Sequence, residues 1–230
     1  MKGTRPLTNA EIRKVRDAFS GTYAQRNRGL FMLGVSIGGR VSELLALTVG
    51  DVWQNEQPVT DFQFDKNIVK GGETARTIPV NSDGRTAIEE IIAWHRAYFG
   101  VVHPDVPLFP SQKGNTAIKR QAVHKILNDV FAKAGLTGKL ATHTLRKTFA
   151  QRLYQQCNDI YVVRELLGHK NVITTQAYIG INYVSAQDAV EAMSLTAEEN
   201  PTDPLDDFEP ETLVAKVIEF GYEVRLRMEK

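Results

Sequence analysis

A change in the periodicity of the apolar residues constrains this fold more than any other feature of the sequence. Before about residue 48, and again from about residue 82 to 168, apolar residues recur every three or four positions, which is typical of helices. Between Val52 and Val80, β-branched and aromatic residues alternate with polar ones instead, as in Asp61–Phe64. The sequence therefore predicts a mostly helical α+β domain with one small antiparallel β-sheet.

Capping residues and glycines predict where the helices begin and end. Thr8 precedes Glu11 by three residues, a capping box that starts a first helix. A second, largely buried helix from about Tyr23 is expected to stop at Gly38-Gly39, and a short helix to resume at Val41–Leu47. Further helices are expected at about 84–98, at 117–134 behind Thr116 as N-cap, from Thr142 as N-cap to about Cys157, and from Asp159 as N-cap to Gly168.

Charge divides the chain near residue 195. Residues 1–195 hold 24 Lys and Arg against 17 Asp and Glu, a net charge of +7, whereas residues 196–230 hold 4 against 10, a net charge of −6. A basic body suits a polyanionic partner, although many proteins of other functions carry a similar charge. We expect a catalytic domain at 1–195, an acidic linker at 196–210 and an amphipathic C-terminal helix at 211–230.

Composition also argues against several classes of protein. Cys157 is the one cysteine, which excludes an internal disulfide and a thiolate metal cluster within one chain. No apolar run approaches the roughly 20 residues of a membrane span, and the N-terminal residues lack the apolar core of a signal peptide. We therefore expect a cytoplasmic protein without membrane contact. No metal site is expected at His95, His103 or His124, because their spacing matches no known pattern of metal ligands.

Four short polar patterns follow one another in a fixed order along the chain. Each places an ionisable residue at a glycine break, a turn or a helix end. Any one alone is weak evidence, since a lone arginine after a glycine or a half-buried tyrosine is ordinary. The patterns are Gly39-Arg40-Val41-Ser42-Glu43-Leu44, Lys70-Gly71-Gly72, His143-Thr144-Leu145-Arg146, and Gly168-His169 with Tyr178 nine residues beyond the histidine.

The residue types in these patterns suit phosphoryl transfer. That chemistry needs the non-bridging phosphate oxygens clamped, the nucleophile relieved of its proton and the leaving oxygen supplied with one. Arg40 and Arg146 are candidates for the clamp, because the planar guanidinium binds phosphate oxygens bidentately and stays charged. His143 and Arg146 lie three residues apart, so one helix face presents both near the positive end of the helix dipole.

Together the patterns resemble the catalytic domain of the tyrosine recombinases, the phage integrase family, over about residues 5–195. The resemblance implies a site-specific recombinase or integrase that cleaves and rejoins double-stranded DNA through a 3′-phosphotyrosyl intermediate, with no metal or nucleotide cofactor. It also implies a role for each residue: Tyr178 as nucleophile, His143 as general base, Lys70 as general acid to the 5′-oxygen, His169 as a donor to the phosphate, Arg40 and Arg146 as the clamp, and Glu43 as the residue that orients Arg40.

The chain departs from the family pattern in two places. The turn at Lys70 is one residue longer than the commonest form, Glu73 stands where the family often has a basic residue, and Lys66 is a nearby alternative. Many members also carry an N-terminal core-binding domain, whereas the catalytic pattern begins here at the first residues. We therefore expect either a fragment or a minimal recombinase, with weak, strongly salt-dependent DNA binding.

Two other functions fit the same residues. A type IB topoisomerase-like enzyme could use this chemistry to nick and reseal DNA, and a catalytically idle DNA-binding protein could retain the patterns. The resemblance further implies self-association into a tetramer on DNA through a helix after the tyrosine, for which Ser185–Met193 is the candidate. The acidic region beyond it is interpreted either as a solvated tail or as a mildly autoinhibitory or docking tail.

Overall fold

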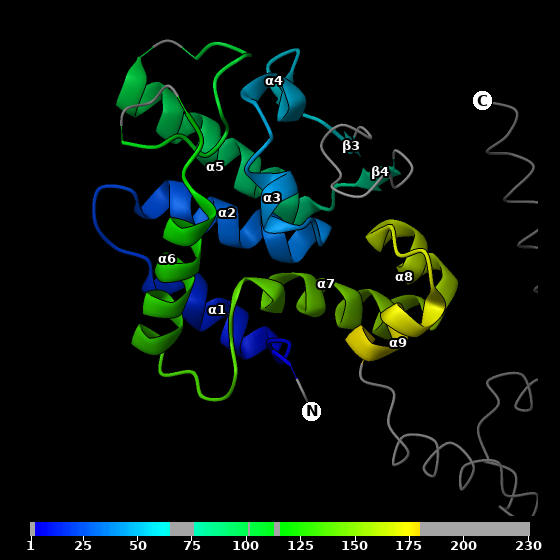
Figure 1. The fold of residues 1–230 in the computed structure, drawn as a ribbon. Coiled ribbons are helices and arrows are strands. Elements are labelled where there is room, and N and C mark those ends of the chain that lie inside the picture. Colours follow the sequence, from blue (N-terminus) through cyan, green and yellow to red (C-terminus); the bar gives the residue numbers. More distant parts are fainter. Residues whose placement is uncertain (1–2, 65–75, 101, 113–115, 180–230) are drawn as a thin grey trace, which may run out of the picture. The chain divides into compact units, whose positions relative to one another are not determined.

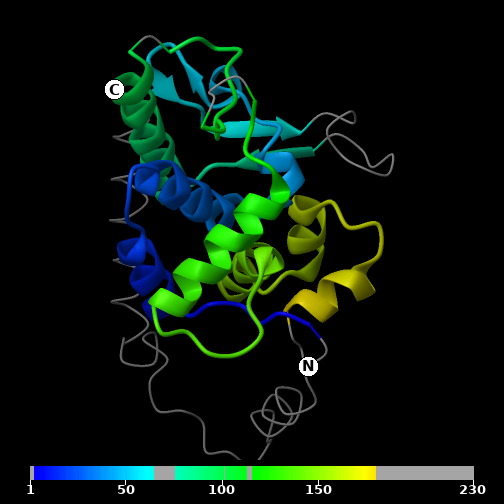
Figure 2. The ribbon, with the colours of Figure 1, turned by 60° about the vertical axis from the view of Figure 1, so that its left-hand side comes forward.

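The computed structural model describes residues 3–64, 76–100, 102–112 and 116–179, which lie within one compact unit (Figures 1 and 2). The predicted Lys70 turn, Ser185–Met193 helix, acidic linker and C-terminal helix lie outside these residues. None of the helices described is long and apolar enough to cross a membrane. The helices are α1 (Asn9–Ala18), α2 (Ala24–Ile37), α3 (Val41–Leu44), α4 (Val49–Val52), α5 (Ser82–Phe99), α6 (Arg120–Lys133), α7 (Thr142–Cys157), α8 (Ile160–Leu167) and α9 (Val172–Ile179).

Several predicted helix boundaries are confirmed. Thr8 caps α1, and both halves of its capping box with Glu11 are formed. Gly38 ends α2 with φ +63°, and a side chain there would collide with the ring of Phe149, because an added Cβ would lie 2.2 Å from it. Asp159 caps α8 by accepting hydrogen bonds from two backbone N–H groups. Local signals of this kind act within one helical turn, so the sequence reveals them directly.

Other predicted boundaries are wrong. Thr116 does not cap α6, which begins at Arg120. Thr116 instead accepts a hydrogen bond from the backbone of Ser111 at 2.7 Å, because the chain turns back on itself here and the next residues stay extended. Thr142 is the first residue of α7 rather than its cap, and the short helix expected to reach Leu47 ends at Leu44. α9 is a further helix, beyond those predicted from the sequence.

The β-region forms two separate antiparallel ladders rather than one sheet. β1 (Trp53–Gln54) pairs with β2 (Gln57–Pro58), and β3 (Asp61–Phe64) pairs with β4 (Arg76–Pro79). In the second ladder, Phe64 lies opposite Arg76 and the side chains of Phe62, Phe64, Arg76 and Ile78 are all buried. This register brings a charged side chain, that of Arg76, into the interior at the first residue of β4.

Two apolar clusters hold the helices. The larger contains α2, which packs against α5 and α7 and contributes Phe31, Leu33 and Ile37. The smaller joins α7, α8 and α9 through Ala150, Val163, Leu167 and Ile179, and these helices lie together in both views (Figures 1 and 2). Because α7 contributes Leu145 to the first cluster and Ala150 to the second, its N-terminal half lies where the two clusters meet.

Candidate active site

Five of the predicted site residues line one pocket of about 310 Å³. The pocket lies among the α2–α3 break, the first turns of α7 and the α8–α9 segment, so it joins parts of the chain that are far apart in sequence. Its remaining lining residues are polar: Lys170, Asn171 and Thr174. The five predicted residues that the structure brings together are Arg40, His143, Arg146, His169 and Tyr178.

Arg146 is the most buried cation of the pocket, with only 2% of its surface exposed. One guanidinium nitrogen donates a hydrogen bond of 2.7 Å to the carbonyl of Gly38, and the other donates to the carbonyl of Leu167. These bonds fix the plane of the guanidinium between the C-terminal ends of α2 and α8. Burial, followed by repulsion from Arg40 and Arg76, lowers the pKa of Arg146 to about 10. Arg146 therefore stays charged at pH 7.

Glu43 binds Arg40 beside the pocket. Its carboxylate accepts 2.7 Å hydrogen bonds from both the backbone N–H and the guanidinium of Arg40, and a 2.6 Å bond from Arg76. Burial by itself would raise the pKa of Glu43, but attraction to Arg76 and the bonds from both arginines leave it below its usual value. Glu43 is therefore an ionised carboxylate that pairs with two cations.

The two histidines of the pocket are both held neutral at pH 7. His143 is solvent-exposed in the first turn of α7, and partial desolvation of its ring, then repulsion from Arg120 and Arg146, lowers its pKa. His169 follows the last turn of α8, and burial, then repulsion from Arg146, lowers its pKa to about 4. A neutral imidazole can accept a proton, which is the state that a general base requires.

Tyr178 reaches the pocket from the last turn of α9. Its ring meets that of His169 edge-on, with centroids 5.1 Å apart and an interplanar angle of 66°. The ammonium of Lys147 lies 5.5 Å from the centre of the Tyr178 ring. The phenol is half-buried against the smaller apolar cluster, so the ring is held while the pocket stays open to a ligand.

Lys70, the sixth predicted catalytic residue, lies outside the described residues, so the geometry leaves its role as a prediction. Sequence reasoning missed two polar contacts of the site. Arg76 is buried and binds Glu43, and the buried hydroxyl of Thr175 hydrogen-bonds Nδ1 of His169 at 3.0 Å. The periodicity of β4 could have revealed the first, because Arg76 alternates in phase with the buried Ile78.

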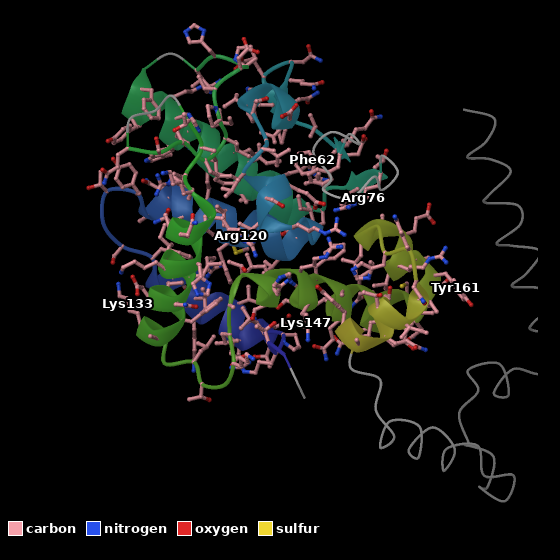
Figure 3. All side chains as sticks on the ribbon, viewed as in Figure 1. Phe62, Arg76, Arg120, Lys133, Lys147 and Tyr161 are labelled. Atoms are coloured by element: carbon pink, nitrogen blue, oxygen red, sulfur yellow. The ribbon has the colours of Figure 1, made fainter. Side chains whose placement is uncertain are left out.

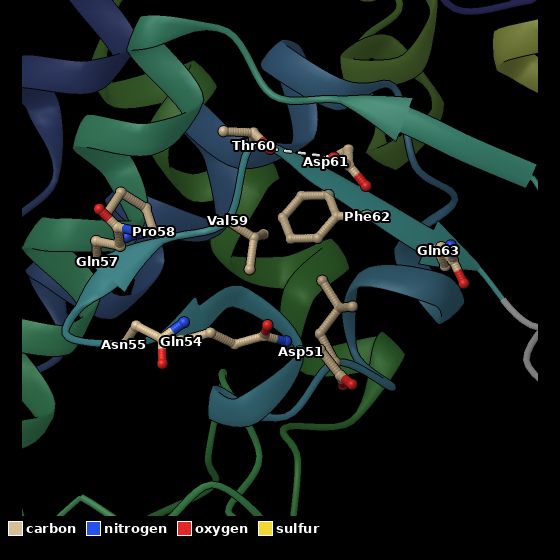
Figure 4. A pocket seen from close by; sticks show the side chains of 11 residues that line it. Asp51, Gln54, Asn55, Gln57, Pro58, Val59, Thr60, Asp61, Phe62 and Gln63 are labelled. Atoms are coloured by element: carbon tan, nitrogen blue, oxygen red, sulfur yellow. Dashed lines mark hydrogen bonds between the residues drawn. The ribbon is translucent and has the colours of Figure 1, made fainter.

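A second cavity, of about 490 Å³, lies beside β1, β2 and β3 (Figure 4). Among the residues that the structure describes, its lining includes Asp51 and Asp61 together with the amides of Gln54, Gln57 and Gln63, and no lysine or arginine. Carboxylates without cations repel phosphate, so this larger cavity is poorly suited to a nucleic-acid backbone. The smaller pocket, with its arginines, is the candidate site.

The lowered pKa of His169 predicts that acid destabilises the fold. The unfolded chain has a histidine pKa of about 6.5, so between pH 6.5 and 4 it binds a proton that the folded chain excludes, and stability falls as pH falls. From pH 7 to 5 we expect a loss of roughly 1–2 kcal/mol from this residue. Urea unfolding of wild type and His169→Gln at both pH values measures it. A matched change at the exposed His103 is the control, and an unchanged pH slope in His169→Gln would contradict the prediction.

The charges and hydroxyl of the pocket indicate the kind of ligand that it can bind. Two arginine cations, one of them almost fully buried, face a pocket that a tyrosine and two neutral histidines also line. Such a cluster favours a bound anion, and the planar forks suit phosphate oxygens. A tyrosine hydroxyl beside a clamped phosphate is a potential nucleophile. The arrangement has the groups that phosphoryl transfer requires.

The chain belongs to the phage integrase family, whose sequence profile matches residues 5–184. It is 35% identical over 158 residues to the tyrosine recombinase XerD of Corynebacterium glutamicum, covering 68% of this chain and 48% of that protein. It is 34% identical over 178 residues to the tyrosine recombinase XerC of Halalkalibacterium halodurans, covering 75% of this chain and 56% of that protein. The chain thus spans about half the length of these relatives.

Solved structures give the same result for the fold. The XerH site-specific recombinase in a post-cleavage complex with its difH substrate matches with a TM-score of 0.64 and 26% identity, over 83% of this chain and 54% of that one. XerA recombinase matches with a TM-score of 0.65 and 20% identity, over 84% of this chain and 66% of that one. The mostly helical α+β fold expected from the sequence is therefore confirmed.

Proposed function

We propose that this chain is a site-specific DNA recombinase that cleaves and rejoins double-stranded DNA through a 3′-phosphotyrosyl intermediate. The observation that carries the proposal is the convergence of Arg40, Arg146, His143, His169 and Tyr178 on one pocket. Family membership supports the same reaction, because the relatives named above are tyrosine recombinases and XerH was captured on a DNA substrate.

In the proposed first step, the hydroxyl oxygen of Tyr178 attacks the scissile phosphorus. The new bond joins the tyrosine to the 3′-phosphate, and the bond from phosphorus to the 5′-oxygen breaks. His143 takes the phenolic proton, and Lys70 supplies a proton to the departing 5′-oxygen. Reversal with a different 5′-hydroxyl rejoins the DNA, and the covalent bond conserves the energy that ligation needs.

The arginines would stabilise the transition state. Arg146 is held rigidly by two backbone carbonyls and Arg40 by Glu43, so neither must reorganise as charge develops on the phosphate oxygens. His169, oriented by Thr175, would donate a further hydrogen bond to the same oxygens. These protein groups supply the positive charge and the proton transfers, so the proposed mechanism uses no metal or nucleotide cofactor.

A nicked duplex tests this proposal. The substrate is a pool of duplexes with randomised half-sites and a nick one nucleotide beyond the cleavage position, so that the short 5′-hydroxyl fragment diffuses away and the covalent complex accumulates. We expect an adduct that survives denaturant and yields a consistent DNA sequence when recovered. Relaxation of supercoiled plasmid of any sequence would indicate the topoisomerase-like alternative, and binding without an adduct would indicate the idle one.

The same complexes would report on assembly and on domain limits. We propose that the chain forms a tetramer on DNA and that its catalytic domain ends near residue 195, followed by an acidic linker and an amphipathic helix. Light scattering of the trapped complex gives the number of chains per duplex. A chain ending at residue 195 should form the same adduct. If this truncated chain is inactive, the catalytic domain extends beyond residue 195.

A further inference from the structure

Arg76 is a buried charge that the mechanism above leaves unused. Arg76 is the first residue of β4 and is labelled in Figure 3. It pairs with Phe64 across the ladder, only 8% of its surface is exposed, and its guanidinium lies 5.1 Å from the centre of the Phe64 ring. Its one ion pair among the described residues is with Glu43, 33 positions earlier, at 2.6 Å. A buried charge is costly to keep, so its place in the site calls for a physical reason.

Charge balance at Glu43 supplies that reason. Glu43 binds both Arg40 and Arg76, so the three side chains together carry a net charge of +1. Without Arg76, the carboxylate and Arg40 would form a neutral pair, and Glu43 would hold the Arg40 guanidinium more strongly against the approach of a phosphate. Arg76 therefore offsets part of the attraction between Glu43 and Arg40.

Arg76 also lies against the segment that carries His169. Gly168 ends α8 with φ +64°, and a Cβ added there would lie 2.8 Å from a terminal nitrogen of Arg76. That nitrogen and Nε of Arg76 have no hydrogen-bond partner among the described residues, which lowers the contribution of this side chain to stability. A side chain selected for stability alone would satisfy these donors, so the contacts favour a role in the site.

We propose that Arg76 is a positioning residue, which shares the Glu43 carboxylate and so weakens the hold of Glu43 on Arg40 at the scissile phosphate. The inference rests on the proposed function, because it concerns the charge available to the same pocket. Arg76 acts through Glu43 and Arg40 rather than by touching the substrate. Its effect should therefore fall on the cleavage step, with little change in DNA affinity.

Three variants test the proposal in the full-length chain. Arg76→Met, which removes the charge but keeps the side-chain length, should slow adduct formation at saturating DNA about 100-fold. Arg76→Met combined with Glu43→Gln removes both charges and should recover at least tenfold of that loss, because the glutamine oxygen can still accept from the Arg40 guanidinium without a negative charge that competes with the phosphate. The double variant should also fold, since a neutral replacement for a buried ion pair is well tolerated. Arg76→Lys keeps the charge, so its rate of adduct formation should stay within about tenfold of the wild-type rate.

Arg96→Met is the matched control. Arg96 also forms a 2.6 Å ion pair, with Glu56, and lies 5.6 Å from the ring centre of Trp53, but it is outside the pocket. The Arg96→Met variant should therefore cleave DNA at the wild-type rate. Wild-type cleavage by Arg76→Met, or a double variant no faster than the single one, would overturn the proposal while leaving the function intact. A wild-type chain that forms no adduct would overturn both.

Discussion

Replacing Tyr178 with phenylalanine is expected to reduce covalent attachment to the nicked duplex to background. Only the hydroxyl is lost, so the edge-on contact with His169 and the packing against the smaller apolar cluster remain. DNA affinity should therefore stay within about twofold of wild type, because the change removes a reacting atom rather than a binding surface. Denaturing gels measure the adduct, and fluorescence anisotropy of the same duplex measures the affinity.

Tyr161→Phe is the control for this change. Tyr161 is 61% exposed on α8 and does not line the pocket, so its variant should form the adduct at the wild-type rate. A denaturant-resistant adduct in Tyr178→Phe would show that another residue is the nucleophile. Tyr161 and Tyr183 would then be the next candidates, and peptide mapping of the adduct would identify which of them carries the DNA.

The second large effect is expected for Arg146→Lys. Lysine keeps the charge but cannot donate to the carbonyls of Gly38 and Leu167 and to a phosphate in one plane. We expect adduct formation to fall at least about 10³-fold, in the range that a catalytic arginine contributes to phosphoryl transfer. One buried carbonyl would also lose its partner, which should cost about 1–3 kcal/mol of stability. Single-turnover cleavage and urea unfolding measure the two effects separately.

Arg26→Lys separates catalysis from stability. Arg26 is also a buried arginine, 5% exposed, and donates a 2.6 Å hydrogen bond to the carbonyl of Pro110. It lies outside the pocket, so its variant should lose a similar amount of stability and keep its cleavage rate. If the cleavage rates of both variants fall in proportion to their free energies of unfolding, the effect of Arg146→Lys comes from lost stability and not from a lost phosphate contact.

The sequence by itself determined the features that depend on neighbours along the chain. The capping box of Thr8 and Glu11, the glycine stop at Gly38 and the cap at Asp159 are formed as predicted, because each acts within about one turn of helix. The Arg40–Glu43 contact spans three residues and follows the same rule. The order of the polar patterns also indicated the family, which the match over residues 5–184 confirmed.

Tertiary structure decided what depends on segments that meet only after folding. The pairing of Arg76 with Glu43, the approach of Arg76 to Gly168 and the bonds of Arg146 to two helix ends join residues many positions apart. Local propensity misplaced the start of α6, because the backbone at Thr116 bonds across a loop instead of opening a helix. Such contacts form only when the apolar clusters bring their elements together, since packing over the whole domain selects one arrangement from many that are locally allowed.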